Sequence, residues 1–251
     1  MEVLGTLGYS GEPIELIATD TICYLSGNGL CLHDTIKGPK DIIWKSDKGI
    51  SCWSSHQLTN QIIIAPNIDN GNLTLYSLAT SQVLGSLSNP SAGKIIHFSF
   101  SSDGLYLLAL SDPTDHKIIM WNLQTFQIIL SVNLLLNRKC EKCLMHPTDN
   151  LSFLLYGSES ILYCNMIEIL GNYDLKFHPI HLKMESKFPS SSSASAAPNQ
   201  VDEDDDSERY AGISCAVWSP PNSLIVGTFD GSIYFVEPIS KYSKKLFSIV
   251  L

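Results

Sequence analysis

Short hydrophobic runs separated by polar turns fill residues 94–133, and their pattern is repeated along the rest of the chain. The four runs occupy residues 95–100, 105–110, 117–121 and 126–132. The first two turns between them are rich in serine, aspartate, glycine and proline. Short runs with β-branched residues and turns at this spacing are typical of strands and not of helices. Residues 94–133 are therefore predicted to form one four-stranded antiparallel sheet.

The same four-strand unit recurs, more faintly, on both sides of this stretch. The residue that follows the apolar triplet of each third strand marks the repeat: Asp34, Ser77, Asn122, Met166 and Glu237. The successive intervals are 43, 45, 44 and 71 residues, and the last includes an insertion of about 25 residues. A period of ~40–45 residues with four strands per unit is that of WD-type β-propeller blades. The sequence predicts an all-β fold, a WD-type β-propeller with about five divergent blades visible.

These units divide the chain into three regions. Residues 1–184 hold four blades, residues 185–209 form an insertion, and residues 210–251 hold a fifth blade. Because the insertion is rich in serine and then in acids, it is too polar to form a core, and we expect it to be disordered. The chain stops within the predicted last strand, residues 245–251. We therefore expect a truncated fifth blade and a propeller that is incomplete or part of a larger one.

Charge and hydropathy narrow the choice of partners. The chain carries 16 basic and 25 acidic residues, a net charge of −9, so we expect no nucleic-acid partner. The apolar run at residues 128–136 is interrupted by Ser131 and Asn133 and is too short for a membrane span. Seven cysteines, an odd number, with no signal peptide at the start, indicate thiols in a reducing, cytoplasmic compartment.

The side chains that could act in catalysis or bind a metal do not form the set that an enzyme needs. Cys140, Cys143 and His146 are of the types that bind zinc, but alternation along the predicted strand turns the two cysteines to opposite faces. His97 and His116 have no serine and aspartate at matching spacing, so we expect both to be structural. The sequence contains no phosphate-binding glycine loop. We expect a non-enzymatic protein with no metal and no cofactor.

Two further features have alternative interpretations. Trp53 and Trp218 hold equivalent places before the first turn of their blades, where Phe100 also lies. This equivalence favours packing between blades over a ligand cage. The acidic run at residues 202–208 is either a solvated part of the insertion or a docking site for a basic partner, and the solvated interpretation is favoured.

Three segments of the chain are similar to the axonemal class of WD-repeat proteins. They are residues 21–28, residues 97–104 followed by 117–122, and residues 215–226 after the insertion. Together they resemble the N-terminal part of a cilia- and flagella-associated WD-repeat protein, in which propellers precede a coiled coil. As in those divergent proteins, the repeats lack the Gly-His opening and most Trp-Asp endings, and Asn122 stands where a Trp-Asp pair would have aspartate.

The resemblance implies a structural and regulatory part of the motile cilium or flagellum. Proteins of this class help to tether inner-arm dynein heads to the doublet microtubules and so regulate beating. The implied partners are a related WD-repeat tether subunit, the inner-arm dynein and the doublet microtubule. The implied location is the axonemal cytoskeleton. The alternative is a general cytosolic WD-repeat scaffold in trafficking or protein turnover.

Partner contacts of propellers concentrate on turns at their rims. Two polar turns of this chain are therefore candidates, at residues 67–72 and 112–116. The candidate contact residues are Asn67, Asp69, Asn70, Asn72, Asp112, Asp115 and His116.

Overall fold

Five four-stranded antiparallel sheets make up the protein. The computed structural model describes residues 14–134, 140–182, 212–240 and 242–248. In every sheet the four strands are consecutive in the chain, and each strand pairs with the next one. This meander is the architecture of a propeller blade, so the predicted all-β propeller fold with five visible blades is confirmed.

The strands of the five blades have the following bounds. Blade 1 consists of β1 (Glu15–Ala18), β2 (Thr21–Ser26), β3 (Gly29–Asp34) and β4 (Gly38–Lys45). Blade 2 consists of β5 (Ile50–His56), β6 (Gln61–Pro66), β7 (Leu73–Ser77) and β8 (Gln82–Leu87). Blade 3 consists of β9 (Ile95–Phe100), β10 (Tyr106–Ser111), β11 (Lys117–Asn122) and β12 (Gln127–Asn133). Blade 4 consists of β13 (Lys142–Met145), β14 (Ser152–Gly157), β15 (Ser160–Ile169) and β16 (Asn172–Pro179). Blade 5 consists of β17 (Ile213–Ser219), β18 (Ser223–Thr228), β19 (Ser232–Glu237) and β20 (Tyr242–Ser248).

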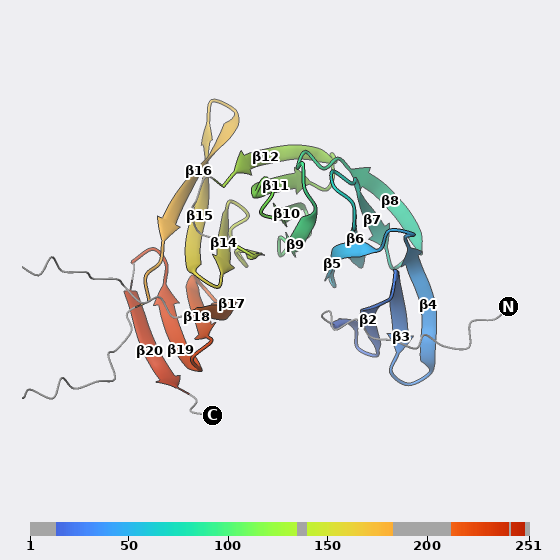
Figure 1. Ribbon diagram of the computed structural model, residues 1–251, viewed down its shortest axis with the longest axis horizontal. Coiled ribbons are helices and arrows are strands. Elements are labelled where there is room, and N and C mark those ends of the chain that lie inside the picture. Colours follow the sequence, from blue (N-terminus) through green and yellow to red (C-terminus); the bar gives the residue numbers. More distant parts are fainter. Residues whose placement is uncertain (1–13, 135–139, 183–211, 241, 249–251) are drawn as a thin grey trace, which may run out of the picture.

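The blades stand side by side along an arc that is open between blade 1 and blade 5 (Figure 1). The first strand of each blade lies toward the concave side, where β9 contacts both β5 and β13. The fourth strands, such as β8, β12 and β16, lie on the convex side.

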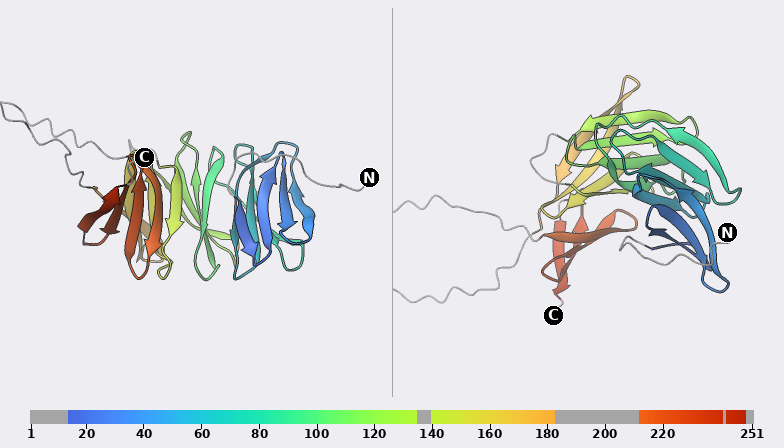
Figure 2. Two further views of the ribbon diagram at one scale, coloured as in Figure 1. Left: turned by 90° about the horizontal axis from the view of Figure 1, so that it is seen from below. Right: turned by 45° about the vertical axis from the view of Figure 1, so that its right-hand side comes forward.

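The strands run between two rims of the arc (Figure 2). Because each blade is a four-strand meander, its β-turns and its linkers fall on fixed rims. We call one the linker rim: it carries the turns between second and third strands and the linkers between blades. The other, the opposite rim, carries the turns that join first to second and third to fourth strands.

The hydrophobic core is divided among the spaces between neighbouring blades. In β10, Leu107 faces blade 2 and its neighbour Leu108 faces blade 4, and both are 0% exposed. In β11, Ile118 and Met120 belong to the core between blades 3 and 4, whereas Ile119 and Trp121 belong to the core between blades 2 and 3. Blade 3 therefore buries both faces of its central strands, which explains why their sequence is apolar without alternation.

The tryptophans pack between blades. Trp53 belongs to the core between blades 1 and 2, and Trp218 packs against the core between blades 4 and 5. Trp121 is fully buried and donates its Nε1–H to the Ser88 carbonyl at 3.1 Å. The prediction of packing between blades for Trp53 and Trp218 is confirmed.

The last two strands of blade 4 are shifted from their predicted positions. The sequence suggested strands near residues 161–167 and 175–183, but β15 extends to Ile169 and β16 spans Asn172–Pro179. The two residues between them, Leu170 and Gly171, have φ of 52° and 80°, as a tight turn of type I′ requires. A leucine in this conformation gave no turn signal, so the hairpin tip was missed.

The ends of the fifth blade also differ from expectation. Its last strand, β20, begins three residues before the predicted start at residue 245 and ends at Ser248. Residues 249–251 and the predicted insertion at residues 185–209 lie outside the described residues. The described chain stops at residue 182 and resumes at residue 212, both on the linker rim.

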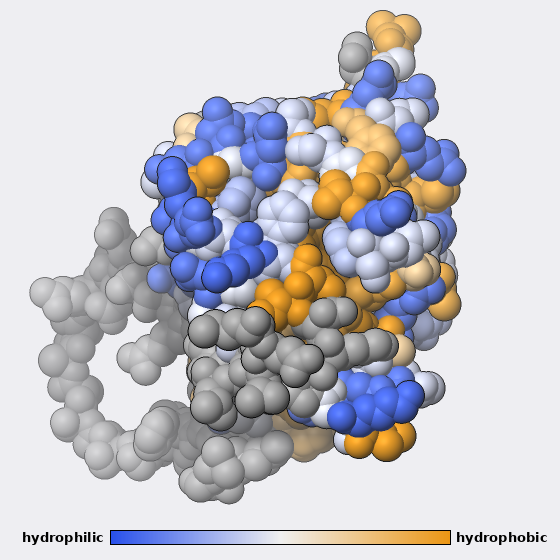
Figure 3. Space-filling view, turned by 90° about the vertical axis from the view of Figure 1, so that its right-hand side faces the viewer, coloured by the Kyte–Doolittle hydropathy of each residue, from blue (hydrophilic) through white to orange (hydrophobic). Residues whose placement is uncertain are grey.

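Apolar residues also reach the surface of the first two blades. Figure 3 views this side of the arc, where apolar patches lie between hydrophilic ones. Ile42 of β4 and Val83 of β8 are 43% and 55% exposed. Exposed apolar side chains of this kind are usual on folded proteins. Among the described residues no helix is long and apolar enough to cross a membrane.

Candidate protein-interaction surface

Both predicted contact turns lie on the linker rim of adjacent blades. Residues 67–72 connect β6 to β7 in blade 2, and residues 112–116 connect β10 to β11 in blade 3. The linker between these blades, residues 88–94, bonds to both turns: Gly93 O accepts from Asn70 N–H, and Ala92 N–H donates to Asp115. The structure thus gathers all seven candidate residues on one rim.

The turn of blade 2 is the exposed part of this surface. Its four candidate residues, Asn67, Asp69, Asn70 and Asn72, are all exposed. The backbone of the turn is fixed, because Asn67 N–H donates to Gly49 O at 3.0 Å and Asn70 N–H donates to Gly93 O at 3.3 Å. Asn70 has a φ of 52°, a conformation that asparagine tolerates better than most residues. The turn therefore presents amide and carboxylate groups to solvent from a fixed backbone.

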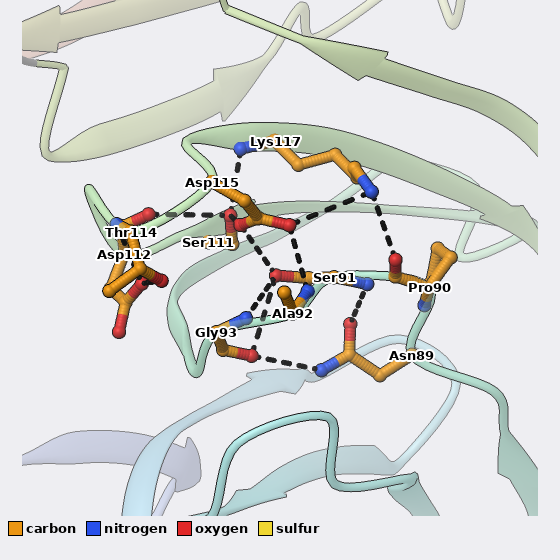
Figure 4. A network of polar contacts seen from close by, with 10 residues as sticks. All are labelled: Asn89, Pro90, Ser91, Ala92, Gly93, Ser111, Asp112, Thr114, Asp115 and Lys117. Atoms are coloured by element: carbon orange, nitrogen blue, oxygen red, sulfur yellow. Dashed lines mark hydrogen bonds and ion pairs between the residues drawn. The ribbon is translucent and has the colours of Figure 1, made fainter.

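The turn of blade 3 is instead tied inward through Asp115 (Figure 4). Its carboxylate accepts hydrogen bonds from Ser111 Oγ at 2.6 Å, Ser91 Oγ at 2.8 Å and Ala92 N–H at 2.8 Å. Lys117 Nζ lies 3.6 Å from the same carboxylate and donates to Pro90 O at 2.9 Å. Asp115 thus joins its own blade to the linker that precedes it.

This network also sets the charge of Asp115. Burial alone would raise the pKa of the carboxyl, but hydrogen bonds from Ser111, Ala92 and Ser91, with the charge of Lys117, lower the pKa below its usual value. The group is therefore a carboxylate at neutral pH, and its bonds to the linker are charge-assisted.

Asp112 and His116 are the other two candidate residues of the blade 3 turn. Asp112 accepts hydrogen bonds from the N–H and the hydroxyl of Thr114, and a side chain at Gly93 would collide with both residues. His116 has a φ of 43°, and its Nε2 lies 3.0 Å from the Cys140 carbonyl, which connects blade 3 to the start of blade 4. The structural role that the sequence suggested for His116 fits this contact. Asp112, Asp115 and His116 are all half-buried, unlike the residues of the blade 2 turn.

The concave side of the arc contains a cavity of about 360 Å³ that the sequence did not indicate. It is lined by strands β5 and β9 and by Glu15, His97 and Lys142. Glu15 reaches from blade 1 to blade 2, where its Oε2 accepts hydrogen bonds from Ser55 N–H at 3.0 Å and Ser55 Oγ at 2.5 Å. Burial raises the pKa of Glu15, and the two Ser55 bonds oppose this shift. A contact between residues of different blades leaves no local sequence signal.

His97 lies in the wall of the same cavity as a neutral side chain. Burial is the main cause that lowers the pKa of His97 to about 4, and the nearby Lys142 adds to the effect. Its Nδ1 accepts a hydrogen bond from Cys143 N–H at 3.4 Å and lies 3.5 Å from Cys143 Sγ. The expected structural role of His97 fits these contacts between blades 3 and 4.

The expectation that Cys140 and Cys143 point to opposite faces of a strand was wrong. Strand β13 begins at Lys142, and Cys140 therefore precedes the strand and is not governed by its alternation. Cys140 and Cys143 both lie in the core between blades 3 and 4. Their sulfurs have different neighbours, Ser160 Oγ at 3.7 Å and His97 Nδ1 at 3.5 Å. Within the described ranges, no three His, Cys, Asp or Glu side chains are grouped so that they could hold a metal.

The cysteines are free thiols, and most of them are buried. None of the seven cysteines, all of which lie in the described ranges, forms a disulfide. Five of them are buried, and burial raises the pKa of the Cys143 and Cys164 thiols well above the ordinary range. Such thiols are packing groups and poor nucleophiles.

Comparison with known proteins identifies the fold. No protein-family profile matches the sequence, and no curated protein matches it. Among solved structures, the chain is similar to the crystal structure of the Myceliophteria thermophila Cps50 (Swd1) β-propeller domain. The TM-score is 0.57 at 17% sequence identity, and the match covers 92% of this chain and 59% of that one. The likeness establishes a β-propeller, and the chain spans about three fifths of the length of that domain.

Proposed function

We propose that this chain is a non-enzymatic protein-interaction scaffold that binds its partner through the linker rim. The observation that carries the proposal is the contrast within that rim: the exposed blade 2 turn stands beside the internally bonded blade 3 turn. Loops held by a rigid scaffold are the usual binding elements of β-propellers. Fold alone does not select a partner, so the surface must supply the specificity.

The blade 2 turn suits a polar protein partner. Asn67 and Asn72 offer amide donors and acceptors, and Asp69 adds one carboxylate. The Asn70 amide instead donates to the carbonyls of Asn89 and Ser91 in the linker. Because bonds from Asn67 N–H to Gly49 O and from Asn70 N–H to Gly93 O already hold the backbone of this turn, little backbone entropy is lost when a partner binds. The net charge of −9 agrees with a protein partner and not with nucleic acid.

We further propose that the scaffold works in the axoneme of a motile cilium or flagellum. Support comes from the resemblance of residues 21–28, 97–104 and 215–226 to cilia- and flagella-associated WD-repeat proteins. In this role its partners are a related WD-repeat tether subunit, an inner-arm dynein and the doublet microtubule. It would help to hold the dynein heads on the doublet and so regulate beating. A general cytosolic WD-repeat scaffold is the alternative.

Localisation in ciliated cells tests the axonemal part of the proposal. The tagged chain is expressed, and the axonemes are extracted with detergent and then with high salt. We expect the protein to stay with the doublets after both extractions, as a structural tether does. A diffuse cytosolic signal in cells with normal cilia contradicts the axonemal role and favours the general cytosolic scaffold.

A further inference from the structure

A second polar and aromatic site lies on the opposite rim, where blade 4 meets blade 5. It is a cavity of about 210 Å³. Its walls come from both blades: His146, Asp149 and Tyr163 from blade 4, and Trp218, Asn222 and Ile239 from blade 5. Ligand sites for drug-sized molecules are usually about 300–1,000 Å³, so this cavity has room for a single long side chain.

Aromatic rings form two walls of this cavity and are held in place. The ring of Trp218 is inclined by 69° to that of His146, with 4.4 Å between centroids, and by 76° to that of Tyr163, with 6.4 Å between centroids. Tyr163 is anchored by its hydroxyl, which donates to Ser152 Oγ at 3.0 Å. The faces of Trp and Tyr rings attract cations.

Asp149 gives the cavity its charge. Its two carboxylate oxygens accept hydrogen bonds from Leu151 N–H at 2.9 Å and Ser152 Oγ at 2.6 Å, which fix the group. A carboxylate has about four acceptor positions, so both oxygens can accept a further hydrogen bond. No lysine or arginine is among the residues that line the cavity.

His146 adds no competing positive charge. Burial lowers the pKa of His146, although Asp149 and Asn222 oppose the shift. Its Nδ1 accepts hydrogen bonds from Thr148 N–H at 3.2 Å and Asp149 N–H at 3.1 Å. The imidazole is therefore neutral at pH 7, and Asp149 carries the one formal charge of the lining.

We propose that this cavity binds the guanidinium of an arginine side chain from a basic segment of a protein partner. A planar guanidinium can stack on Trp218 and donate two parallel hydrogen bonds to Asp149, which an ammonium cannot. The net charge of −9 favours the approach of a basic segment. The inference rests on the proposed scaffold role only in taking the arginine from a protein.

Binding is measured on the purified 251-residue chain by NMR, with N-acetyl-arginine-methylamide as the probe. Each of the four tryptophans gives one indole N–H signal, and Trp218→Phe identifies the signal of Trp218. We expect the arginine probe to shift this signal, and the citrulline analogue, which is neutral with the same shape, to leave it unchanged. The lysine analogue should bind more weakly. No shift with arginine, or equal binding of arginine, lysine and citrulline, overturns the proposal.

Two variants locate the site. Asp149→Asn removes the charge, and we expect it to weaken arginine binding about tenfold. Ile239→Lys places a cation at the mouth, and because Ile239 is 71% exposed, the fold should not change. Leu58→Lys is the matched control, since Leu58 is 83% exposed in the β5–β6 turn on the same rim. Equal loss in Ile239→Lys and Leu58→Lys contradicts the site. Binding of the arginine probe to the purified chain does not depend on the axonemal location. The arginine site and the proposed scaffold function can therefore fail independently.

Discussion

Blade 3 and blade 5 have the same four-strand pattern but differ in which faces of their strands are buried. In β10, the neighbours Leu107 and Leu108 are both 0% exposed. In β18, Leu224 is 0% exposed but its neighbour Ile225 is 36% exposed. Blade 3 lies between two blades, whereas the described part of blade 5 packs against blade 4 alone. The position of a blade along the arc therefore decides whether one face or both faces of its strands form core.

Substitutions in the central strands test this difference with the largest expected effect. Leu108→Ala should lower the free energy of unfolding by about 2–5 kcal/mol, because it leaves a cavity in the core between blades 3 and 4. Ile225→Ala should cost less than about 1 kcal/mol, because its side chain already contacts water. Urea unfolding of both variants measures the two losses. Equal losses would mean that the free face of blade 5 is covered in solution.

The pH dependence of stability should come mainly from blade 3. His97 has a pKa of about 4 in the folded chain and about 6.5 when unfolded, so the unfolded state binds the proton first as pH falls. Stability should be complete above pH 6.5 and fall between pH 6.5 and 4, by up to roughly 3 kcal/mol.

Urea unfolding at pH 7 and at pH 4.5 measures this fall. His97→Asn, whose amide oxygen can still accept the Cys143 N–H, should reduce the difference between the two pH values. A remainder is expected from His146, whose pKa burial also lowers, and from Glu15, whose raised pKa acts with the opposite sign. The same pH dependence in His97→Asn and the original chain would show that His97 is not buried as a neutral group.

Substitution of a turn aspartate should reduce stability more in blade 3 than in blade 5, but the difference should be smaller than in the tests above. Asp115 bonds to the linker residues Ser91 and Ala92, whereas the partners of Asp230 in blade 5, Thr228 and Ser232, belong to its own turn. Asp115→Asn should cost about 1–3 kcal/mol, because asparagine keeps one acceptor oxygen and therefore loses either the Ala92 bond or the bonds from Ser91 and Ser111. Asp230→Asn should cost less, and thermal melting compares the two. A larger loss in Asp230→Asn would contradict the role of Asp115 as the tie between blades.

The sequence predicted the features that repeat within one blade. The apolar runs of β9 to β12 and the turns between them carry a local signal, so the fold class and the order of the blades followed from the period. Contacts between blades carry no such signal. The Glu15 bonds to Ser55, the cavity on the concave side and the common core of Cys140 and Cys143 depend on how neighbouring sheets are placed.

The sequence predicted that both candidate turns lie at a rim, but it did not indicate which of their residues are exposed. Both turns are rich in Asn and Asp, which favour turns whether they face solvent or bond to the backbone. Composition therefore could not distinguish the exposed Asn67 and Asp69 from Asp115, whose hydrogen-bond partners Ser91 and Ala92 come from the preceding linker. The structure makes this distinction, because it shows which of these side chains are exposed and which are bonded to the linker.

The most direct test of the scaffold role compares the two rims by retention on axonemes and by melting temperature. The double variant Asn67→Ala, Asp69→Ala changes exposed residues of the linker rim, and Gln124→Ala, Thr125→Ala changes exposed residues of the opposite rim. We expect the first variant to be washed from axonemes at lower salt than the original chain, with an unchanged melting temperature. The second should be retained like the original chain. Full retention of the linker-rim variant at high salt would contradict binding through this surface.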